Sequence, residues 1–221
     1  MIDLNFLTGK TTDQFVNFLN SKNLVHRDMN QNLLNLIKSA EQDGFEIALT
    51  SSFRSFELQQ VIWNEKALGV RPVLDSNSNP IDLTDLSTEE ILFSILRWSA
   101  LPGASRHHWG SDLDIYDKKS ISVDYKVQLI PSEYELGGPF YKLNLWLEAN
   151  MHKFGFFRPY EVDKGGIAPE PWHLSYRPLS ENFLSLYSFE RFEEHLKNSN
   201  FLLIEEAKQN SSEIYQKYIQ L

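Results

Sequence analysis

The chain has 221 residues, of which 42% are hydrophobic and 13% aromatic, so it can bury one full core and we expect a single domain spanning residues 1–221. Its formal net charge of −9, from 30 acidic and 21 basic residues, does not attract a polyanion, so we expect no nucleic-acid partner. The absence of cysteine excludes disulfides, thiolate nucleophiles and cysteine-ligated zinc, which leaves histidine and carboxylates as strong metal ligands.

The N-terminus lacks a basic segment followed by an apolar run, and no later apolar stretch is long enough to span a bilayer. As printed, the chain is therefore expected to carry no leader and no membrane segment, and to be cytoplasmic. If a signal peptide has been removed, the expected compartment is the periplasm. We expect a monomer.

The first quarter of the chain predicts two helices and one strand. Apolar residues at helical spacing predict helices over 12–20 and 30–43, the second followed by Gly44 at a position where glycine commonly ends a helix. An apolar segment over 45–51 predicts a strand. A turn should follow this strand and lead into a helix that carries Gln59.

The segment 68–86 is rich in glycine, proline, asparagine and aspartate, which predicts a long loop. Ser87 and Glu90 then have the spacing of a capping box and open a helix expected to continue through Trp98. The Leu-Pro-Gly run at 101–103 stops that helix. The residues that follow should lie on a loop.

The rest of the chain predicts three strands, one helix and a helical tail. The strands are expected over 113–116, 123–130 and 172–176, and the helix over 143–153. Two amphipathic stretches around 183–196 and 201–218 have helical spacing and carry no chemical motif. They form an expected C-terminal extension of about 179–221.

Two short motifs far apart in the sequence carry the chemistry, S-R-H-H-W-G-S-D-L-D at 105–114 and E-P-W-H at 170–173. Within them, His107, Asp114 and His173 offer two imidazoles and one carboxylate, the ligand set of a catalytic zinc whose fourth position stays open for water. Glu170 is then the carboxylate that takes a proton from this water. The motifs predict metal-assisted hydrolysis with Zn2+ as cofactor.

Neighbouring residues leave alternative ligands open. His108 competes with His107, while Asp112 and Asp117 compete with Asp114, and Asp112 shares a strand face with Asp114. The spacing S-x-H-x-x-G-x-x-x-D is met by His107 and Asp114 and fails for His108. We therefore expect Asp112 beside the ligands rather than on the metal. The remaining histidines lie outside any motif and are interpreted as structural: His26, His152 and His195.

Arg54 is the candidate for contact with an anion. It follows an apolar strand, where burying a cation is costly unless the cation faces an anion. Its guanidinium suits a substrate carboxylate or the oxyanion of a tetrahedral intermediate. Gln59 and Ser105 are weaker candidates that would orient Arg54 or bind substrate, and Trp172 is expected to line the substrate pocket.

At four motifs the sequence resembles the VanY-type D-alanyl-D-alanine carboxypeptidases, zinc metallopeptidases of the group that includes lysostaphin-type and Hedgehog-type domains. The motifs occur in family order between about Leu33 and Pro178: Ser52-Phe53-Arg54-Ser55 with Gln59, S-x-H-x-x-G-x-x-x-D, Phe154-Gly155-Phe156, and Glu170-Pro171-Trp172-His173. The resemblance implies an α+β fold whose small antiparallel sheet carries the zinc site between flanking helices. It also implies that Glu170 is the base and that Arg54 clamps substrate or oxyanion.

The implied function is hydrolysis of the terminal D-alanine bond of a peptidoglycan stem peptide or muropeptide. An L,D-carboxypeptidase, a peptidoglycan endopeptidase and a zinc-stabilised binding module without catalysis remain alternatives, and so does a structural protein without metal. Phage endolysins of the group end in an Asp-x-Pro-His-like motif, which disfavours them here. The chain departs from the family at Asp112, where a small or apolar residue is usual, and over 68–100, which resembles an insertion.

Overall fold

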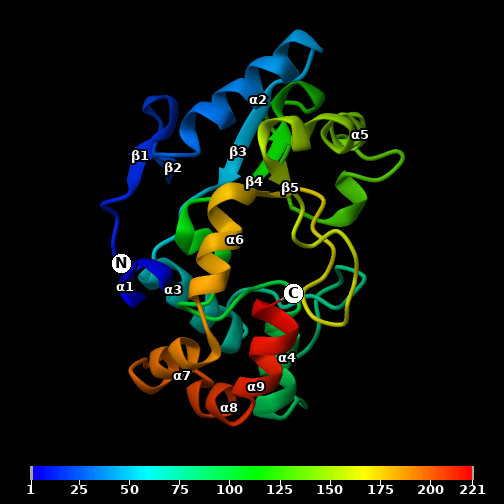
Figure 1. Ribbon diagram of the computed structural model, residues 1–221. Coiled ribbons are helices and arrows are strands. Elements are labelled where there is room, and N and C mark those ends of the chain that lie inside the picture. Colours follow the sequence, from blue (N-terminus) through cyan, green and yellow to red (C-terminus); the bar gives the residue numbers. More distant parts are fainter. Residues whose placement is uncertain (1, 221) are drawn as a thin grey trace.

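The computed structural model describes residues 2–220, which form a sheet-containing half and a helical half (Figure 1). The helices are α1 (Leu4–Leu7), α2 (Asn30–Gln42), α3 (Phe56–Ala67), α4 (Thr88–Leu96), α5 (Tyr141–Asn150), α6 (Arg177–Leu186), α7 (Phe189–Lys197), α8 (Ile204–Gln209) and α9 (Ser211–Ile214). The strands are β1 (Phe15–Asn17), β2 (Leu24–His26), β3 (Ile47–Ser51), β4 (Asp112–Asp117), β5 (Phe156–Phe157) and β6 (His173–Tyr176). Short helical turns are η1 (Phe18–Asn20), η2 (Arg106–Trp109), η3 (Lys118–Ser120), η4 (Pro131–Glu133), η5 (Met151–Phe154) and η6 (Tyr215–Ile219).

The sheet that carries the chemical motifs has the order β3-β4-β6-β5, and all its neighbouring strands are antiparallel. Its register places Asp114 of β4 opposite His173 of β6. Because side chains alternate along a strand, Leu113 and Ile115 point to the other face, where they are fully buried in a core shared with α2 and α5. The predicted α+β fold with a small antiparallel sheet is confirmed.

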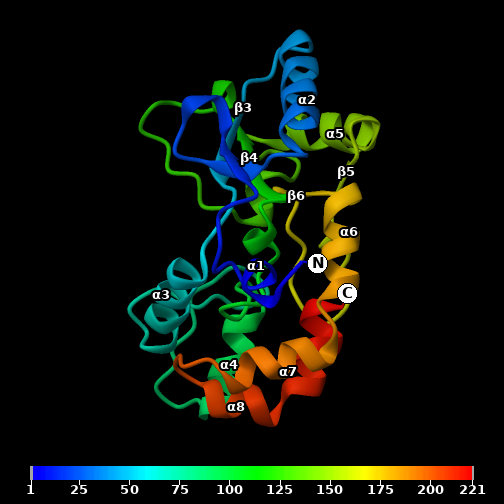
Figure 2. The same ribbon diagram turned by 60° about the vertical axis from the view of Figure 1, so that its left-hand side comes forward.

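A second core occupies the helical half. It contains residues of α1, α3 and α4 together with residues of the C-terminal helices, and Trp109 of η2 packs into it. Figure 2 shows α3, α4, α7 and α8 gathered below the sheet, with α6 running between the two halves. The predicted helical C-terminal extension is therefore confirmed, although Ser188 divides its first stretch by capping α7.

Most predicted elements are confirmed: 30–43 as α2, 45–51 as β3, the helix with Gln59 as α3, 113–116 as β4, 143–153 as α5 and η5, and 172–176 as β6. The capping box is present, since the Ser87 hydroxyl accepts the Glu90 N–H and the Glu90 carboxylate accepts the Ser87 N–H. The helix it opens ends at Leu96, before Trp98. Within residues 2–220, no helix combines the length and apolarity that a bilayer crossing requires.

The predicted helix over 12–20 is wrong. Instead, β1 pairs antiparallel with β2, and η1 follows β1. The ring of Phe15 packs on Phe53, with centroids 4.2 Å apart, and also against His26. Nine residues form few helical turns, so strand pairing and the packing of the half-buried Phe15 ring outweigh a weak periodicity.

The predicted strand over 123–130 is also wrong. The backbone N–H groups of Gln128 and Leu129 donate to the buried carboxylate of Glu133, over 3.0 and 2.8 Å. Ile130 N–H donates to the same carboxylate over 3.4 Å. These donors are satisfied by a side chain rather than by a neighbouring strand, so the segment forms an irregular loop.

Candidate metal centre

Three expected ligands converge from three elements. His107 lies on η2, Asp114 on β4 and His173 on β6, and one ligand atom from each lies within 4.8 Å of the others. His107 Nε2 is 3.2 Å from Asp114 Oδ2, and His173 Nδ1 is 3.3 Å from Asp114 Oδ1. Within residues 2–220, no other group of three or more such side chains has metal-compatible spacing. His107 lies on a 3-10 turn rather than the expected loop.

The hydrogen bonds of the two imidazoles fix which nitrogen is free. His107 Nδ1 lies 2.9 Å from the Ser52 carbonyl oxygen, which only accepts, so this nitrogen carries the proton. His173 Nε2 lies 2.9 Å from the Asp112 carboxylate and donates in the same way. His107 Nε2 and His173 Nδ1 are thus the nitrogens that face Asp114, and each can bind a metal in its deprotonated form.

Two atoms of this group are buried without a partner. Asp114 Oδ1 and His173 Nδ1 make no hydrogen bond among the described residues, although neither is accessible to solvent. Buried polar atoms are rarely left unsatisfied, and a divalent cation that takes the place of the Nδ1 proton would satisfy both atoms. The two histidines and one carboxylate therefore fit Zn2+, whose catalytic sites use such ligands.

Charged groups around the ligands shift the pKa values of Asp114 and His173. Burial alone would raise the pKa of Asp114, but His107 and His173 outweigh it and hold that pKa well below its usual range. Burial would likewise lower the pKa of His173, yet the carboxylates of Asp112, Asp114 and Glu170 around the ring raise it well above its usual value, so without a cation Nδ1 carries a second proton. A cation at the centre would thus face an ionised carboxylate.

Asp112 binds the ring nitrogen of His173 that does not face Asp114. It is fully buried, and its Oδ1 accepts from Arg106 Nε over 2.8 Å as well as from His173. Ser111 donates to its Oδ2 over 2.7 Å, and Arg106 also donates to Ser175 over 2.6 Å. Asp112 therefore orients His173 and is not among the clustered ligands, as the spacing indicated.

His108 is excluded from the centre by its own contacts. Its Nδ1 donates to the Arg54 carbonyl over 2.6 Å, and its Nε2 accepts the Gly103 N–H over 2.9 Å. Burial lowers its pKa to about 3, so the ring stays neutral. Asp117 is occupied elsewhere, accepting the Glu46 N–H over 2.9 Å. Both residues were open alternatives, and both have structural contacts.

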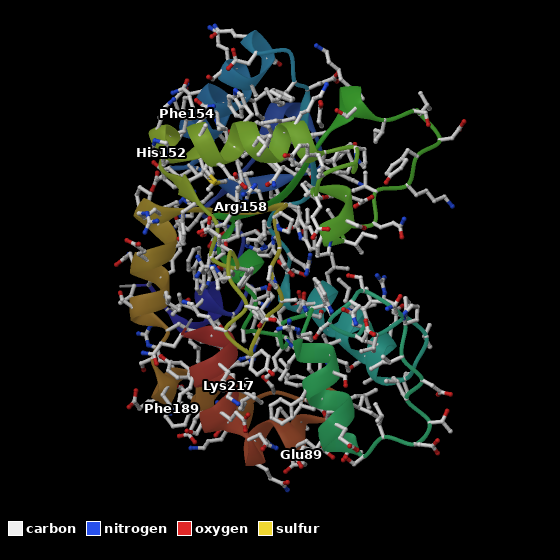
Figure 3. The ribbon with its side chains drawn as sticks, turned by 90° about the vertical axis from the view of Figure 1, so that its right-hand side faces the viewer. Glu89, His152, Phe154, Arg158, Phe189 and Lys217 are labelled. Atoms are coloured by element: carbon white, nitrogen blue, oxygen red, sulfur yellow. The ribbon has the colours of Figure 1, made fainter. Side chains whose placement is uncertain are left out.

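The three histidines interpreted as structural lie outside the metal group. His26 packs against Phe6 and Phe183, and His195 is buried on α7. His152 is exposed in η5, directly after α5, on the outer edge of the sheet-containing half (Figure 3).

Glu170 and Arg54 reach the centre from different loops. Glu170 Oε2 lies 3.2 Å from His173 Nδ1. The Arg54 side chain donates to Gln59 Oε1 over 2.8 Å and to Ser51 Oγ over 2.9 Å. Both acceptors are neutral, and burial lowers the pKa of Arg54. The guanidinium is thus held in place with donors to spare for an anion.

A cavity of about 340 Å³ opens over this group. Of the expected site residues, it is lined by Arg54, Ser105, His107, Asp114, Glu170, Trp172 and His173. Ser105 begins η2 and accepts the His107 N–H over 3.3 Å, and Trp172 stacks on Trp98. Gln59 is fully buried and does not line the cavity. It is held by the Ala100 carbonyl over 2.7 Å and so orients Arg54, one of its two expected roles.

Other lining residues were missed from the sequence. Tyr160 packs edge-on against His173, with ring centroids 4.9 Å apart, and it follows β5 without a surrounding motif. Lys66 and Arg71 also line the cavity. For Lys66 a signal existed, because Gln59, Ile62 and Lys66 lie on one face of a predicted helix.

The family profile described as VanY, D-alanyl-D-alanine carboxypeptidase, matches residues 22–179. An uncharacterized protein of Haemophilus influenzae is 35% identical over 121 residues, which span 54% of this chain and 92% of that protein. A D-alanyl-D-alanine carboxypeptidase of Enterococcus faecalis is 29% identical over 147 residues, spanning 65% of this chain and 45% of the enterococcal protein.

Two solved structures share the fold. A variant of the vancomycin-resistance D,D-pentapeptidase VanY, in complex with Zn(II), has a TM-score of 0.56 at 23% identity and covers 80% of this chain and 85% of that chain. The LD-carboxypeptidase LdcB has a TM-score of 0.53 at 17% identity and covers 95% of this chain and 80% of that chain. Since the family profile matches well over half of the sequence and its motifs meet at one buried centre, the chain belongs to the VanY D-alanyl-D-alanine carboxypeptidase family.

Proposed function

We propose that this protein is a Zn2+-dependent carboxypeptidase that removes the terminal D-alanine from peptidoglycan stem peptides. The observation that carries the proposal is the buried group of His107, Asp114 and His173, whose unpartnered polar atoms lie in one cavity with Glu170 and Arg54. Membership of the VanY family supports the choice of the D-alanine bond.

Each residue has a separate task in this proposal. When bound, Zn2+ supplies Lewis-acid polarisation of the scissile carbonyl and activation of water. The Glu170 carboxylate takes the proton from the attacking water and delivers it to the leaving amine. Arg54 donates its free N–H groups to an anionic oxygen of the substrate or of the tetrahedral intermediate. Asp112 holds the His173 ring in the orientation that presents Nδ1.

The test of the base is Glu170→Gln, which keeps the shape of the side chain and removes its proton acceptor. Zinc should remain stoichiometric, while release of D-alanine from a peptide ending in D-Ala-D-Ala should fall by about two to four orders of magnitude. Glu161→Gln is the matched control, because Glu161 is an exposed glutamate in the same segment between β5 and β6. Near-normal turnover by zinc-loaded Glu170→Gln protein would contradict the role of Glu170. Zinc-loaded native protein that releases no D-alanine would contradict the proposed function.

The second candidate is an L,D-carboxypeptidase, because the fold likeness to LdcB is comparable to the likeness to VanY. Peptides ending in D-Ala-D-Ala and in L-Lys-D-Ala, with the same preceding residues, separate the two activities. Cleavage of an otherwise equal amidated peptide at the same rate would favour an endopeptidase. Binding without turnover on all of these peptides would favour a binding module, whereas the presence of both Glu170 and Arg54 in the cavity wall supports an enzyme.

A further inference from the structure

The cavity holds more positive charge than the metal chemistry uses. Lys66 and Arg71 line it together with Arg54, although the whole chain carries a net charge of −9. Arg71 forms an ion pair with Glu65, so its charge is compensated. Lys66 has neither a hydrogen-bond nor an ion-pair partner in the part of the chain that the structure describes.

Lys66 is positioned by the same helix that positions Arg54. Gln59 and Lys66 lie on one face of α3, seven residues apart, with Ile62 between them at the cavity wall. The Lys66 side chain is half-buried, and its pKa is lowered to about 8, mainly by burial, with Glu170 opposing this shift and Arg54 and Arg71 adding to it. An ammonium group that is partly desolvated and has no counter-ion is unfavourable unless an anion binds there.

The length of α3 sets the distance to this anion. Seven residues rise about 10 Å along a helix axis, and this is the rise from Gln59, which accepts from Arg54, to Lys66. An extended peptide covers about 3.3 Å per residue, so about three peptide residues fit this span. A carboxypeptidase substrate has only one residue after the scissile bond. The part of the substrate near Lys66 must therefore lie on the N-terminal side of that bond.

We propose that Lys66 forms a second anion subsite of the cavity and binds a substrate carboxylate carried two or three residues before the C-terminal residue. This inference rests on the proposed carboxypeptidase function and names a feature of its substrate. A peptide with a neutral amide at that place would be a poorer substrate for the same chemistry.

The experiment uses pairs of N-acetylated tetrapeptides that end in D-Ala-D-Ala and carry either Glu or Gln at the third or fourth position from the C-terminus. Their dissociation constants are measured by calorimetry on zinc-loaded Glu170→Gln protein, and their KM and kcat on the native protein. The Glu peptide should bind about tenfold to a hundredfold more tightly than its Gln partner, the range for a charge-assisted hydrogen bond. The difference should lie in KM and not in kcat, since Lys66 is remote from the reacting bond.

Lys66→Met should abolish the preference for the Glu peptide and leave the Gln peptide unchanged, while Lys66→Arg should retain a preference. Lys38→Met is the matched control, because it removes one positive charge from an exposed position on α2. If Lys66→Met binds the Glu and Gln peptides equally more weakly than the native protein does, or still prefers the Glu peptide, the inference is wrong. Native protein that releases D-alanine without any preference refutes the subsite alone, whereas native protein that releases no D-alanine refutes the function. In that second case the calorimetric comparison still decides whether Lys66 binds a carboxylate.

Discussion

Arg54 carries a half-buried charge, and the hydrogen-bond acceptors of its guanidinium, within residues 2–220, are the neutral side chains of Gln59 and Ser51. Neutral acceptors fix the plane of the guanidinium without neutralising it. The guanidinium therefore keeps its positive charge and points its remaining N–H groups in a fixed direction, so it can bind an anionic oxygen. Lysine cannot reproduce this planar pair of donors.

We predict that Arg54→Lys leaves zinc content unchanged and lowers kcat/KM by about two to three orders of magnitude, the range found when an oxyanion donor is lost. A loss confined to KM would show that Arg54 binds a ground-state carboxylate. An equal fall in kcat and kcat/KM would show that it stabilises the oxyanion. Arg27→Lys, at an exposed position beside β2, is the control, and an Arg54→Lys protein with native kinetics would contradict both roles.

Asp112 determines how firmly His173 presents its free nitrogen. Replacing Asp112 by Asn keeps the size of the side chain but weakens its bond to His173 Nε2 and its ion pair with Arg106. Partners of this kind typically contribute about tenfold to a hundredfold in metal affinity. The zinc dissociation constant of Asp112→Asn, measured against a competing chelator, should rise by that factor. Asp124→Asn, an exposed carboxylate, should leave it unchanged, and an unchanged constant in Asp112→Asn would remove Asp112 from the metal site.

The residues of the centre differ in how visible they are in the sequence. His107 and Asp114 lie in one ten-residue motif and Glu170 and His173 in another, so local spacing identifies them before any fold is known. Lys66 and Tyr160 reach the cavity only because α3 and the loop after β5 pack beside the sheet. Helical spacing places Lys66 on the same face as Gln59, but no local pattern encodes the packing that brings this face, or Tyr160, to the cavity.

At the scale of elements, the segment that leads into η2 is held by hydrogen bonds from the C-terminal part of the chain. His195 of α7 donates from Nε2 to the Pro102 carbonyl over 2.8 Å, and the Tyr187 hydroxyl donates to the Gly103 carbonyl over 2.7 Å. Gly103 in turn donates to His108, which donates to the Arg54 carbonyl. A C-terminal segment without a chemical motif is thus three hydrogen bonds away from the backbone of Arg54.

His195 should make stability depend on pH. Burial lowers its pKa to about 4 from an ordinary 6.5, so below pH 6.5 the unfolded chain binds a proton that the folded chain does not. The free energy of unfolding of the metal-free protein should therefore fall between about pH 6.5 and 4, by at most about 1.4 kcal/mol per pH unit from this residue. His195→Gln keeps an N–H donor and does not titrate, so it should lose about 1–3 kcal/mol less than the native protein over this range.

Urea unfolding of both proteins at pH 7, 5.5 and 4.5 measures the difference. His108 also resists protonation, but it is present in both proteins and cancels in the comparison. Parallel pH profiles for the two proteins would mean that His195 titrates normally in the folded state.

Elements were predicted well where the periodic signal is long. Thirteen residues of α2 repeat their apolar face and bury it against the sheet, whereas β1 and β2 have three residues each and owe their conformation to each other. The loop over 123–130 has the composition of a strand, yet its Gln128 and Leu129 N–H groups donate to the Glu133 carboxylate. Which partner satisfies a backbone group is a tertiary property that composition does not contain.

At the scale of the whole molecule, the metal centre joins the two cores. β4 and β6 belong to the core with α2 and α5, while Trp109 anchors η2 in the helical core. The C-terminal segment completes the helical core and also touches the loop that leads to Glu170, where Gly166 packs on the backbone of Lys217. Figure 3 shows Lys217 on this C-terminal segment, beside the yellow loop.

Gly166→Ala tests whether the C-terminal segment sets the position of Glu170. A Cβ at residue 166 would lie 2.0 Å from the Lys217 carbonyl oxygen, so either the loop or the helix must move. The loop is otherwise tied to Arg97, which donates to the Gly166 carbonyl over 2.8 Å and accepts the Ala168 N–H over 2.9 Å. Overpacking of this kind costs about 1–3 kcal/mol of stability.

We therefore expect a lower melting temperature and a fall in kcat of about tenfold or more, since displacing a catalytic group by about 1 Å can cost up to a hundredfold. The zinc dissociation constant should stay native, because His107, Asp114 and His173 are held by η2 and the sheet rather than by this loop. Lys164→Ala, at an exposed position on the same loop, should change neither quantity. If Gly166→Ala lowers the melting temperature and leaves kcat native, the C-terminal segment stabilises the fold without positioning Glu170.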